Sequence, residues 1–275
     1  MSKPELNKDT QLCISLAARP SNIGTRFHNL LYQQLGIDFI YKAFTTKDIA
    51  AAVGGVRALG IRGCSVSMPF KEAVIPLVDE LDQTAAAIQS VNTIVNTDGY
   101  LKAYNTDYGA VQDLIAKHGL ESGKSVLIRG SGGMAKAVGA AFRDAGFGNG
   151  TLIARNSESG QRLAAELGYR WAAEPAGLTA DIIVNVTPLG MAGGADETTV
   201  AFPAEAIAQA ETIFDVVAFP SETPLILAAR AAGKPVITGA EVIALQAAKQ
   251  FELYTGVRPS PEQVLEASLY SRQPV

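Results

Sequence analysis

The sequence predicts an α/β protein with two domains, and three observations support this fold class. Short runs rich in β-branched residues alternate with longer runs of helical spacing, a pattern typical of mostly parallel sheets covered by helices. The chain has 275 residues, 48% of them hydrophobic, which is enough for one large or two ordinary cores. A glycine-rich turn after Ser125–Arg129 lies within a second series of such elements.

Composition excludes several classes of partner. The formal net charge is −4 and no Lys/Arg run stands out, so we expect no nucleic-acid partner. Met1–Asp9 is polar and no apolar run approaches the ~20 residues of a membrane helix, so we expect a cytoplasmic protein without a membrane partner. Cys13 and Cys64 lie in apolar runs and are expected to be buried free thiols. Two Cys and two isolated His predict no metal site.

The first series of elements occupies roughly the first hundred residues. Its expected strands are Gln11–Leu16, Phe39–Phe44 and Ile61–Ser67, and its expected helices are Ile23–Leu35 and Thr46–Leu59. Val91–Asn96 and Tyr100–Tyr104 then flank Asp98-Gly99, which predicts a hairpin because its tight turn needs positive φ. The hairpin suggests an antiparallel edge to the first sheet, and Thr106–Lys117 is expected to be a helix.

The second series begins at Lys124. Its expected strands are Ser125–Arg129, Thr151–Arg155, Asp181–Val186, Thr212–Val217 and Pro235–Thr238. The expected helices include Met134–Ala145, Ser157–Leu167, Ala240–Tyr254 and Ser260–Ser271, the last opened by Ser260-Pro261.

The glycine-rich turn has the form G-x-G-x-x-G/A and reads Gly130-Ser131-Gly132-Gly133-Met134-Ala135. The first glycine permits a tight turn, the second lets the backbone approach a pyrophosphate, and the small third residue lets the helix pack against the strand. The helix start offers free N–H groups to phosphates. The turn lies between an expected strand and an expected helix, which favours a Rossmann dinucleotide site over a glycine turn without a ligand.

The residue after the second strand of this series indicates which dinucleotide binds. An NAD site usually has Asp or Glu about 20 residues after the glycine turn, bonded to the ribose 2′-hydroxyl. Here the strand ends Ala154-Arg155-Asn156, and a guanidinium matches a 2′-phosphate. We therefore favour NADP over NAD, with a solvated surface arginine as the alternative interpretation of Arg155.

Several motifs, taken in order, resemble the shikimate dehydrogenase family over nearly the whole chain. Ser65–Lys71 (SVSMPFK) is similar to the family's N-V-T-x-P-F-K, and the glycine turn is similar to its G-A-G-G. The other matching segments are Val91-Asn92-Thr93, Asn105-Thr106-Asp107, Asn185–Met191, Asp215-Val216-Val217 with Thr223-Pro224-Leu225, and Glu241–Gln246.

The pattern along the chain predicts one domain boundary near Asn105–Asp107 and another near Gly239, with the last helices returning to the first domain. The resemblance implies that residues 1–106, with 240–275, form a catalytic, substrate-binding domain. It implies an NADP-binding Rossmann domain at 107–239, with a cleft between the two domains. Lys71 and Asp107 would form the catalytic pair, since alcohol oxidation needs a proton removed from oxygen as hydride leaves carbon. The alternatives are a solvated charge for Lys71 and a helix cap for Asp107.

The resemblance also implies the binding residues. Ring hydroxyls of the substrate would bind Ser67, Asn92 and Gln246. The pyrophosphate would be held by Gly130, Ser131, Gly132, Gly133 and Met134, followed by Ala135. The adenosine end would be held by Arg155 and Asn156. The nicotinamide pocket would be lined by Thr187, Gly239 and Val242.

The chain departs from the family pattern where the substrate's acid group binds. Two serines of the family's H-S-x-S-P-x-x-H-N loop fall on Asn22 and Gly24, and a tyrosine falls on Ala218. Ser21, Asn22 and Thr25 are left to bind the acid. Because a site that loses a hydrogen-bond partner discriminates strongly, we expect an altered substrate preference.

The expected function is therefore NADP-linked oxidation of a ring hydroxyl of shikimate or a related cyclic hydroxy acid, as in aromatic amino acid biosynthesis, by a monomer or homodimer. Weak activity on quinate or an amino analogue of shikimate is one alternative. A ligand-binding sensor that keeps the fold is another, although it would not need both Lys71 and Asp107. A methylene-tetrahydrofolate dehydrogenase would share the layout but does not explain the N-T-D motif.

Overall fold

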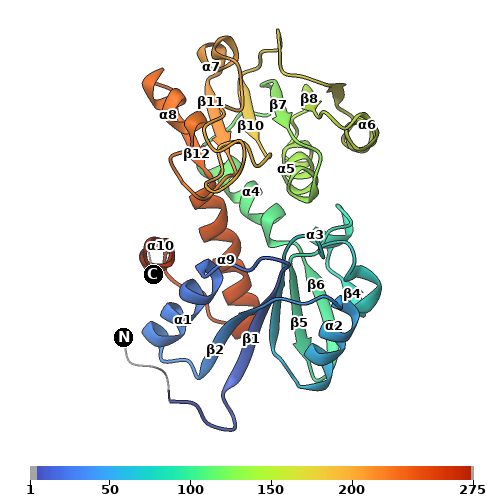
Figure 1. Cartoon of the computed structure of the whole chain (residues 1–275), viewed down its shortest axis with the longest axis vertical. Coiled ribbons are helices and arrows are strands. Elements are labelled where there is room, and N and C mark those ends of the chain that lie inside the picture. Colours follow the sequence, from blue (N-terminus) through green and yellow to red (C-terminus); the bar gives the residue numbers. More distant parts are fainter. Residues whose placement is uncertain (1–4, 274–275) are drawn as a thin grey trace. The chain divides into compact units, whose positions relative to one another are not determined.

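The computed structural model describes residues 5–273, which divide into two compact units. Unit 1 contains the chain up to Thr106 and again from Ala244, and unit 2 contains Asp107–Ile243. Figure 1 labels most of their elements. The first four residues of the polar start Met1–Asp9 and the last two residues of the chain lie outside the described range.

Unit 1 is built on a mixed six-stranded sheet in the order β2-β1-β3-β5-β6-β4. Its strands are β1 (Gln11–Leu16), β2 (Phe39–Phe44), β3 (Gly63–Val66), β4 (Glu80–Leu81), β5 (Thr93–Thr97) and β6 (Tyr100–Tyr104). Strand β1 is parallel to β2 and β3, whereas β5 is antiparallel to β3 and β6. The predicted hairpin is confirmed, with φ of 53° at Asp98 and 88° at Gly99.

Helices cover both faces of this sheet. One face packs on α1 (Ile23–Leu35), α10 (Pro261–Ser271) and the part of α9 (Gly239–Thr255) that belongs to unit 1; the other packs on α2 (Ile49–Ala58), η1 (Ile75–Leu77) and α3 (Gln83–Ala86). Cys13 lies in the first core and Cys64 in the second, and both are buried free thiols as expected. Burial raises the pKa of both thiols.

Unit 2 is built on a fully parallel six-stranded sheet. Its strands are β7 (Val126–Arg129), β8 (Gly150–Ile153), β9 (Arg170–Ala172), β10 (Ile182–Asn185), β11 (Thr212–Asp215) and β12 (Val236–Thr238). From β9 to β12 the spatial order is third, second, first, fourth, fifth, sixth, which is the Rossmann order. The direction of winding reverses between β7 and β10, where this fold binds its ligand.

The helices of unit 2 are the part of α4 (Thr106–Lys117) that follows Thr106, then α5 (Gly133–Asp144), α6 (Ser157–Leu167), α7 (Ala204–Gln209) and α8 (Pro224–Ala231). Helices α7 and α8 cover the sheet face that carries Leu127, Ile183 and Ile213. Helices α5 and α6 pack closely, since a Cβ on Gly139 would lie 2.4 Å from the Leu167 side chain. The predicted α/β fold class is therefore confirmed.

Several predicted boundaries need correction. The expected strand Thr151–Arg155 ends at Ile153, because Asn156 caps α6 by accepting a hydrogen bond from the Ser159 amide. The expected helix Thr46–Leu59 begins only at Ile49, because the Asp48 side chain caps it by accepting from the Ala51 amide. Strands β4 and β9 were not predicted at all.

Within residues 5–273, no helix combines the length and the apolar character needed to cross a bilayer. In the same range, three or more His, Cys, Asp or Glu side chains do not gather in any metal-binding group.

Candidate active site

A buried cluster of polar side chains in unit 1 centres on Asn92, which lies just before β5 and is 3% exposed. Its Oδ1 accepts hydrogen bonds from the Thr106 amide at 2.8 Å and the Thr93 hydroxyl at 2.7 Å. Its Nδ2 donates to the Thr106 hydroxyl at 3.0 Å, and that hydroxyl donates to Gln246 Oε1 at 3.3 Å. Of the predicted substrate-binding residues, Asn92 and Gln246 are thus joined through Thr106.

Gln250 lies one helical turn beyond Gln246 on α9 and hydrogen-bonds two residues of this cluster. Its Nε2 donates to the Thr93 hydroxyl at 2.9 Å and to the Asn92 carbonyl at 3.2 Å. Its Oε1 accepts from the Ser65 hydroxyl at 3.0 Å. Gln250 is 4% exposed, so all of these bonds are shielded from water.

The Ser65 hydroxyl is enclosed by two tyrosines. It accepts a hydrogen bond from Tyr41 Oη at 2.8 Å and lies 3.0 Å from Tyr254 Oη. Burial raises the pKa of both tyrosines, so their hydroxyls stay protonated and able to donate. With the bond to Gln250, these contacts use the one donor and two acceptor positions of the serine hydroxyl.

The segment after β3 carries Ser67 and Lys71. The Ser67 amide donates to the Leu16 carbonyl at 2.9 Å, and the Ser67 carbonyl accepts from the Phe70 amide. The Ser67 side chain is exposed. The Lys71 carbonyl accepts from the Val91 amide at 2.8 Å, so the lysine backbone lies beside the residue that precedes Asn92. The Lys71 side chain is half-buried.

Asp107 follows Thr106 directly, in the first turn of α4, and is 5% exposed. It is the first residue of unit 2, whereas Lys71 belongs to unit 1. The hydrogen bonds between Asn92 and Thr106 fix the backbone immediately before this carboxylate.

The loop predicted to bind the substrate's acid group precedes and opens α1. Ser21 and Asn22 are exposed and Thr25 is half-buried. Asn22 stands at the helix N-cap but makes no side-chain capping bond. A Cβ placed on Gly24 would lie 3.4 Å from Tyr41 Oη, so the tyrosine hydroxyl lies directly below the position where the family pattern has a serine.

The glycine turn in unit 2 joins β7 to α5. Gly130 has φ of 133°, and a Cβ there would lie 2.7 Å from the Val186 side chain, so this position requires glycine. A Cβ on Gly132, the N-cap of α5, would meet no protein atom within 4 Å. Gly132 therefore leaves open space at a helix N-terminus, which suits a pyrophosphate. Ala135 is fully buried against the sheet, as the motif requires.

The turn from β8 to α6 carries Arg155 and Asn156, both exposed. The Ser131 hydroxyl of the glycine turn lies 2.9 Å from the Ser159 hydroxyl, which links the two turns. Met134 follows in the first turn of α5 and is half-buried. The empty space above Gly132 and the arginine beside it fit a dinucleotide that carries an extra phosphate.

A second buried network lies at the ends of β10 and β11. Asp215 accepts from Asn185 Nδ2 at 3.0 Å, the Val217 amide at 3.0 Å and the Thr223 hydroxyl at 2.6 Å. Burial raises the Asp215 pKa to about 6, against the opposing effect of these bonds. The Thr187 hydroxyl donates to Asn185 Oδ1 at 2.6 Å, so this network sets the loop that holds Thr187.

The remaining predicted nicotinamide residues lie at the start of α9. A Cβ on Gly239 would come within 2.4 Å of the Val216 and Val217 backbone, so the helix start packs directly on the chain after β11. Val242 is fully buried.

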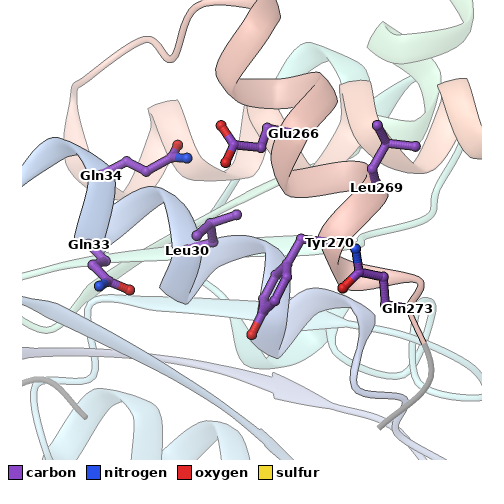
Figure 2. Close-up of a pocket in the computed structure, with 7 residues that line it drawn as sticks. All are labelled: Leu30, Gln33, Gln34, Glu266, Leu269, Tyr270 and Gln273. Carbon is purple, nitrogen blue, oxygen red and sulfur yellow. The ribbon is translucent and has the colours of Figure 1, made fainter. Parts of the chain in front are cut away.

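A surface pocket of unit 1 lies between α1 and α10. Figure 2 shows its lining, which consists of Leu30, Gln33, Gln34, Glu266, Leu269, Tyr270 and Gln273. None of the predicted site residues contributes to this pocket.

The Rossmann strand order, with an open glycine turn at its switch point, gives unit 2 the fold typical of dinucleotide-binding domains, and the first unit carries a polar cluster suited to a small ligand. Residues 22–94 of that first unit match the shikimate dehydrogenase substrate binding domain. A shikimate dehydrogenase-like protein of Haemophilus influenzae is 57% identical over 97% of this chain and 98% of its own length. A shikimate dehydrogenase (NADP(+)) of Moorella thermoacetica is 37% identical over 88% of this chain and 86% of its own length.

A solved structure is similar over the same extent. Shikimate 5-dehydrogenase of Thermus thermophilus, in complex with NADP(H) and shikimate, has a TM-score of 0.85 at 28% identity and covers 95% of this chain and 99% of that one. The chain belongs to the shikimate dehydrogenase family. The expected family and the oxidoreductase class are confirmed by these relatives, and the relatives named shikimate dehydrogenase (NADP(+)) use the cofactor that the sequence predicts.

Sequence reasoning missed three groups in these networks. Gln250 could have been found, because it lies four residues after Gln246 and therefore on the same face of the predicted helix. Tyr41 and Tyr254 carried no such signal, since they are distant in sequence from Ser65 and meet it only once the sheet has formed and α9 has packed on it.

Proposed function

We propose that this protein catalyses reversible hydride transfer between NADP and a ring hydroxyl of shikimate or a related cyclic hydroxy acid. The carrying observation is the buried Asn92–Thr106–Gln246 cluster, which presents amide groups beside the backbone of Lys71 and directly before Asp107. Amides at fixed positions suit neutral hydroxyl groups, each of which both donates and accepts a hydrogen bond.

In this proposal, Asn92, Gln246 and Ser67 bind ring hydroxyls and orient the carbon that reacts. Lys71 and Asp107 act as the acid–base pair that takes the hydroxyl proton during oxidation and returns it during reduction. NADP, when bound, supplies the acceptor for the hydride. Gly130, Gly132 and Gly133 receive its pyrophosphate, Arg155 and Asn156 its adenosine end, and Thr187, Gly239 and Val242 surround its nicotinamide.

The substrate's acid group would meet a different surface from the one in the family pattern. Gly24 offers no hydroxyl, and Tyr41 Oη, which lies beneath it, already donates to Ser65. Ser21, Asn22 and Thr25 remain to bind the carboxylate. We therefore propose weaker oxidation of shikimate than of some other cyclic hydroxy acid, with quinate and amino analogues of shikimate as candidates.

A substrate panel tests this function. Shikimate, quinate and an aminoshikimate are supplied with NADP and with NAD in parallel, and the nicotinamide absorbance is followed. Turnover of at least one acid with NADP is expected. NADPH binding without turnover of any cyclic hydroxy acid would instead favour a sensor, and high efficiency with shikimate would contradict the altered acid site.

Variants at the acid–base pair give the first prediction. Lys71→Ala and Asp107→Asn should each lower kcat by about 10² or more, because each removes a group that moves a proton in the transition state. NADPH affinity, measured by fluorescence titration, should stay close to that of the unaltered protein. Lys47→Ala removes an exposed lysine of unit 1 and serves as the matched control. Variants of Lys71 and Asp107 with undiminished kcat would exclude this pair.

A further inference from the structure

Arg129 is the last residue of β7 and directly precedes Gly130 of the glycine turn. One of its guanidinium N–H groups donates to the Ala201 carbonyl, which holds the side chain in place. The side chain is only 18% exposed, and its ion pair with Glu174 is long, with Glu174 Oε2 4.0 Å from Nη2. That distance exceeds the range of a hydrogen bond, so Glu174 offsets the charge of this largely buried cation without a charge-assisted hydrogen bond.

A second cation lies on the neighbouring strand. In the parallel pairing of β7 with β8, Arg129 is opposite Ile153, and Arg155 follows two residues later. Both arginines therefore lie at the carboxyl edge of the sheet, where a Rossmann fold binds its ligand. Burial and the charge of Arg155 lower the Arg129 pKa, against the opposing effect of Glu174. An anion between the two guanidiniums would relieve this repulsion.

We propose that Arg129 acts together with Arg155 to bind the 2′-phosphate of the dinucleotide, and that this pair selects NADP over NAD. The proposal rests on the proposed dinucleotide binding by unit 2. Guanidinium groups match phosphate oxygens in a bidentate way, and two of them can neutralise a doubly charged monoester. Asn156 cannot replace either arginine in this role, since its side-chain amide is a neutral donor and carries no charge to offset that of the phosphate.

The anchoring of Arg129 adds to its selectivity. Arg155 is exposed and must be ordered when ligand binds, whereas the Ala201 carbonyl already fixes one edge of the Arg129 guanidinium. A donor fixed in advance loses less conformational freedom on binding. Arg129 should therefore contribute to discrimination at least as strongly as the exposed arginine.

Binding of two adenosine fragments of the cofactor tests the proposal without an activity measurement. Adenosine 2′,5′-bisphosphate carries the 2′-phosphate and AMP lacks it, and calorimetry gives the affinity of each for the full chain. Arg129→Met should weaken the bisphosphate by about tenfold or more, as expected for a lost charge-assisted contact, and leave AMP nearly unchanged. Arg129→Gln keeps a neutral N–H donor and removes only the charge, and it should show the same selective loss.

Two further variants complete the test. Arg170→Met removes an arginine from β9 near the opposite edge of the same sheet, where it bonds Asn149, and should leave both affinities unchanged. Glu174→Gln removes a 60%-exposed carboxylate near Arg129 and should tighten the bisphosphate by about twofold only. Equal weakening of both ligands in the Arg129 variants, or no weakening, would overturn the proposal. Equal affinity of the unaltered chain for both ligands would overturn the NADP assignment and this inference with it.

Discussion

Two serines of one motif have different surroundings. Ser65 and Ser67 are two residues apart, so alternation along a strand gives them the same orientation. Ser65 is enclosed by Tyr41, Tyr254 and Gln250, whereas the Ser67 side chain is exposed beyond the end of β3. We infer that Ser65 stabilises the fold of the site and that Ser67 is the hydroxyl available to a ligand.

Alanine at each serine separates these roles. Ser65→Ala should lower the free energy of unfolding by about 1–3 kcal/mol, because buried partners lose their hydrogen bond. Ser67→Ala should change that free energy by no more than about 0.5 kcal/mol, as is usual for an exposed side chain. It should instead raise KM for the substrate by about tenfold, the effect of one lost hydrogen bond near 1.4 kcal/mol. Urea unfolding and steady-state kinetics measure the two effects, and a reversed pattern would contradict the assignment.

At the scale of the element, the β7–turn–α5 segment separates glycines needed for folding from one needed for binding. Gly130 combines positive φ with close contact to Val186, so any side chain there strains the turn. Gly132 has an ordinary φ of −84° and no neighbour within 4 Å of a Cβ. The fold itself therefore tolerates alanine at Gly132, whereas a bound pyrophosphate would not.

Gly132→Ala should thus leave the unfolding free energy within about 0.5 kcal/mol of its original value while weakening NADPH binding by tenfold or more. Gly148→Ala is the matched control, because Gly148 also has nothing within 4 Å of a Cβ but lies in the turn before β8. Thermal unfolding without ligand and fluorescence titration with NADPH give both quantities. If Gly132→Ala bound NADPH normally, the pyrophosphate would have to be placed elsewhere.

The same scale shows what periodicity could predict. Helices such as Ile23–Leu35 and Ser157–Leu167 were predicted with their observed bounds, because their apolar spacing and their ends are local features of the chain. Strands β4 and β9 have two and three residues, too few for an alternating pattern, and they form only because β6 and β8 offer edges to pair with.

At the scale of the whole molecule, each unit contains a buried ionisable side chain whose pKa is shifted because burial disfavours its charged form. His28 is fully buried in unit 1 and stacks on Tyr41 with ring centroids 4.4 Å apart. Burial lowers its pKa to about 3. Asp215 is fully buried in unit 2, and burial raises its pKa to about 6. The two groups therefore predict pH dependences of opposite sign.

Below about pH 6.5 the unfolded chain protonates His28, whereas the folded chain keeps the imidazole neutral down to about pH 3. Acidification from pH 6.5 toward 3 therefore lowers the free energy of unfolding. His28→Phe keeps the aromatic stack and removes the titration. On acidification from pH 7 to pH 4, the unaltered protein should therefore lose about 3 kcal/mol more unfolding free energy than the variant does. Near-ultraviolet circular dichroism of the buried tyrosines follows unit 1, and a difference independent of pH would contradict the burial of a neutral imidazole.

For Asp215, the folded chain holds a proton that the unfolded chain releases between about pH 4 and 6, so stability falls as pH rises through that window. Asp215→Asn removes this dependence. As pH rises from 4 to 7, the unaltered protein should therefore lose up to about 3 kcal/mol more unfolding free energy than the variant does. Trp171, the only tryptophan of the chain, lies on β9 and reports unfolding of unit 2 by fluorescence. A flat difference between the two proteins over this range would rule out the raised pKa.

The sequence by itself determined the fold class, the bounds of the longer elements, the glycine turn and the family, because periodicity, turn residues and motif order are properties of neighbouring residues. Only the tertiary structure decided which side chains meet. The contacts of Ser65 with Tyr41 and Tyr254, of Gln250 with Asn92, and of Arg129 with Ala201 join residues from separate elements. Such partnerships, and the pKa shifts of His28 and Asp215, depend on burial and on hydrogen-bond geometry, and both exist only once the sheets have packed against their helices.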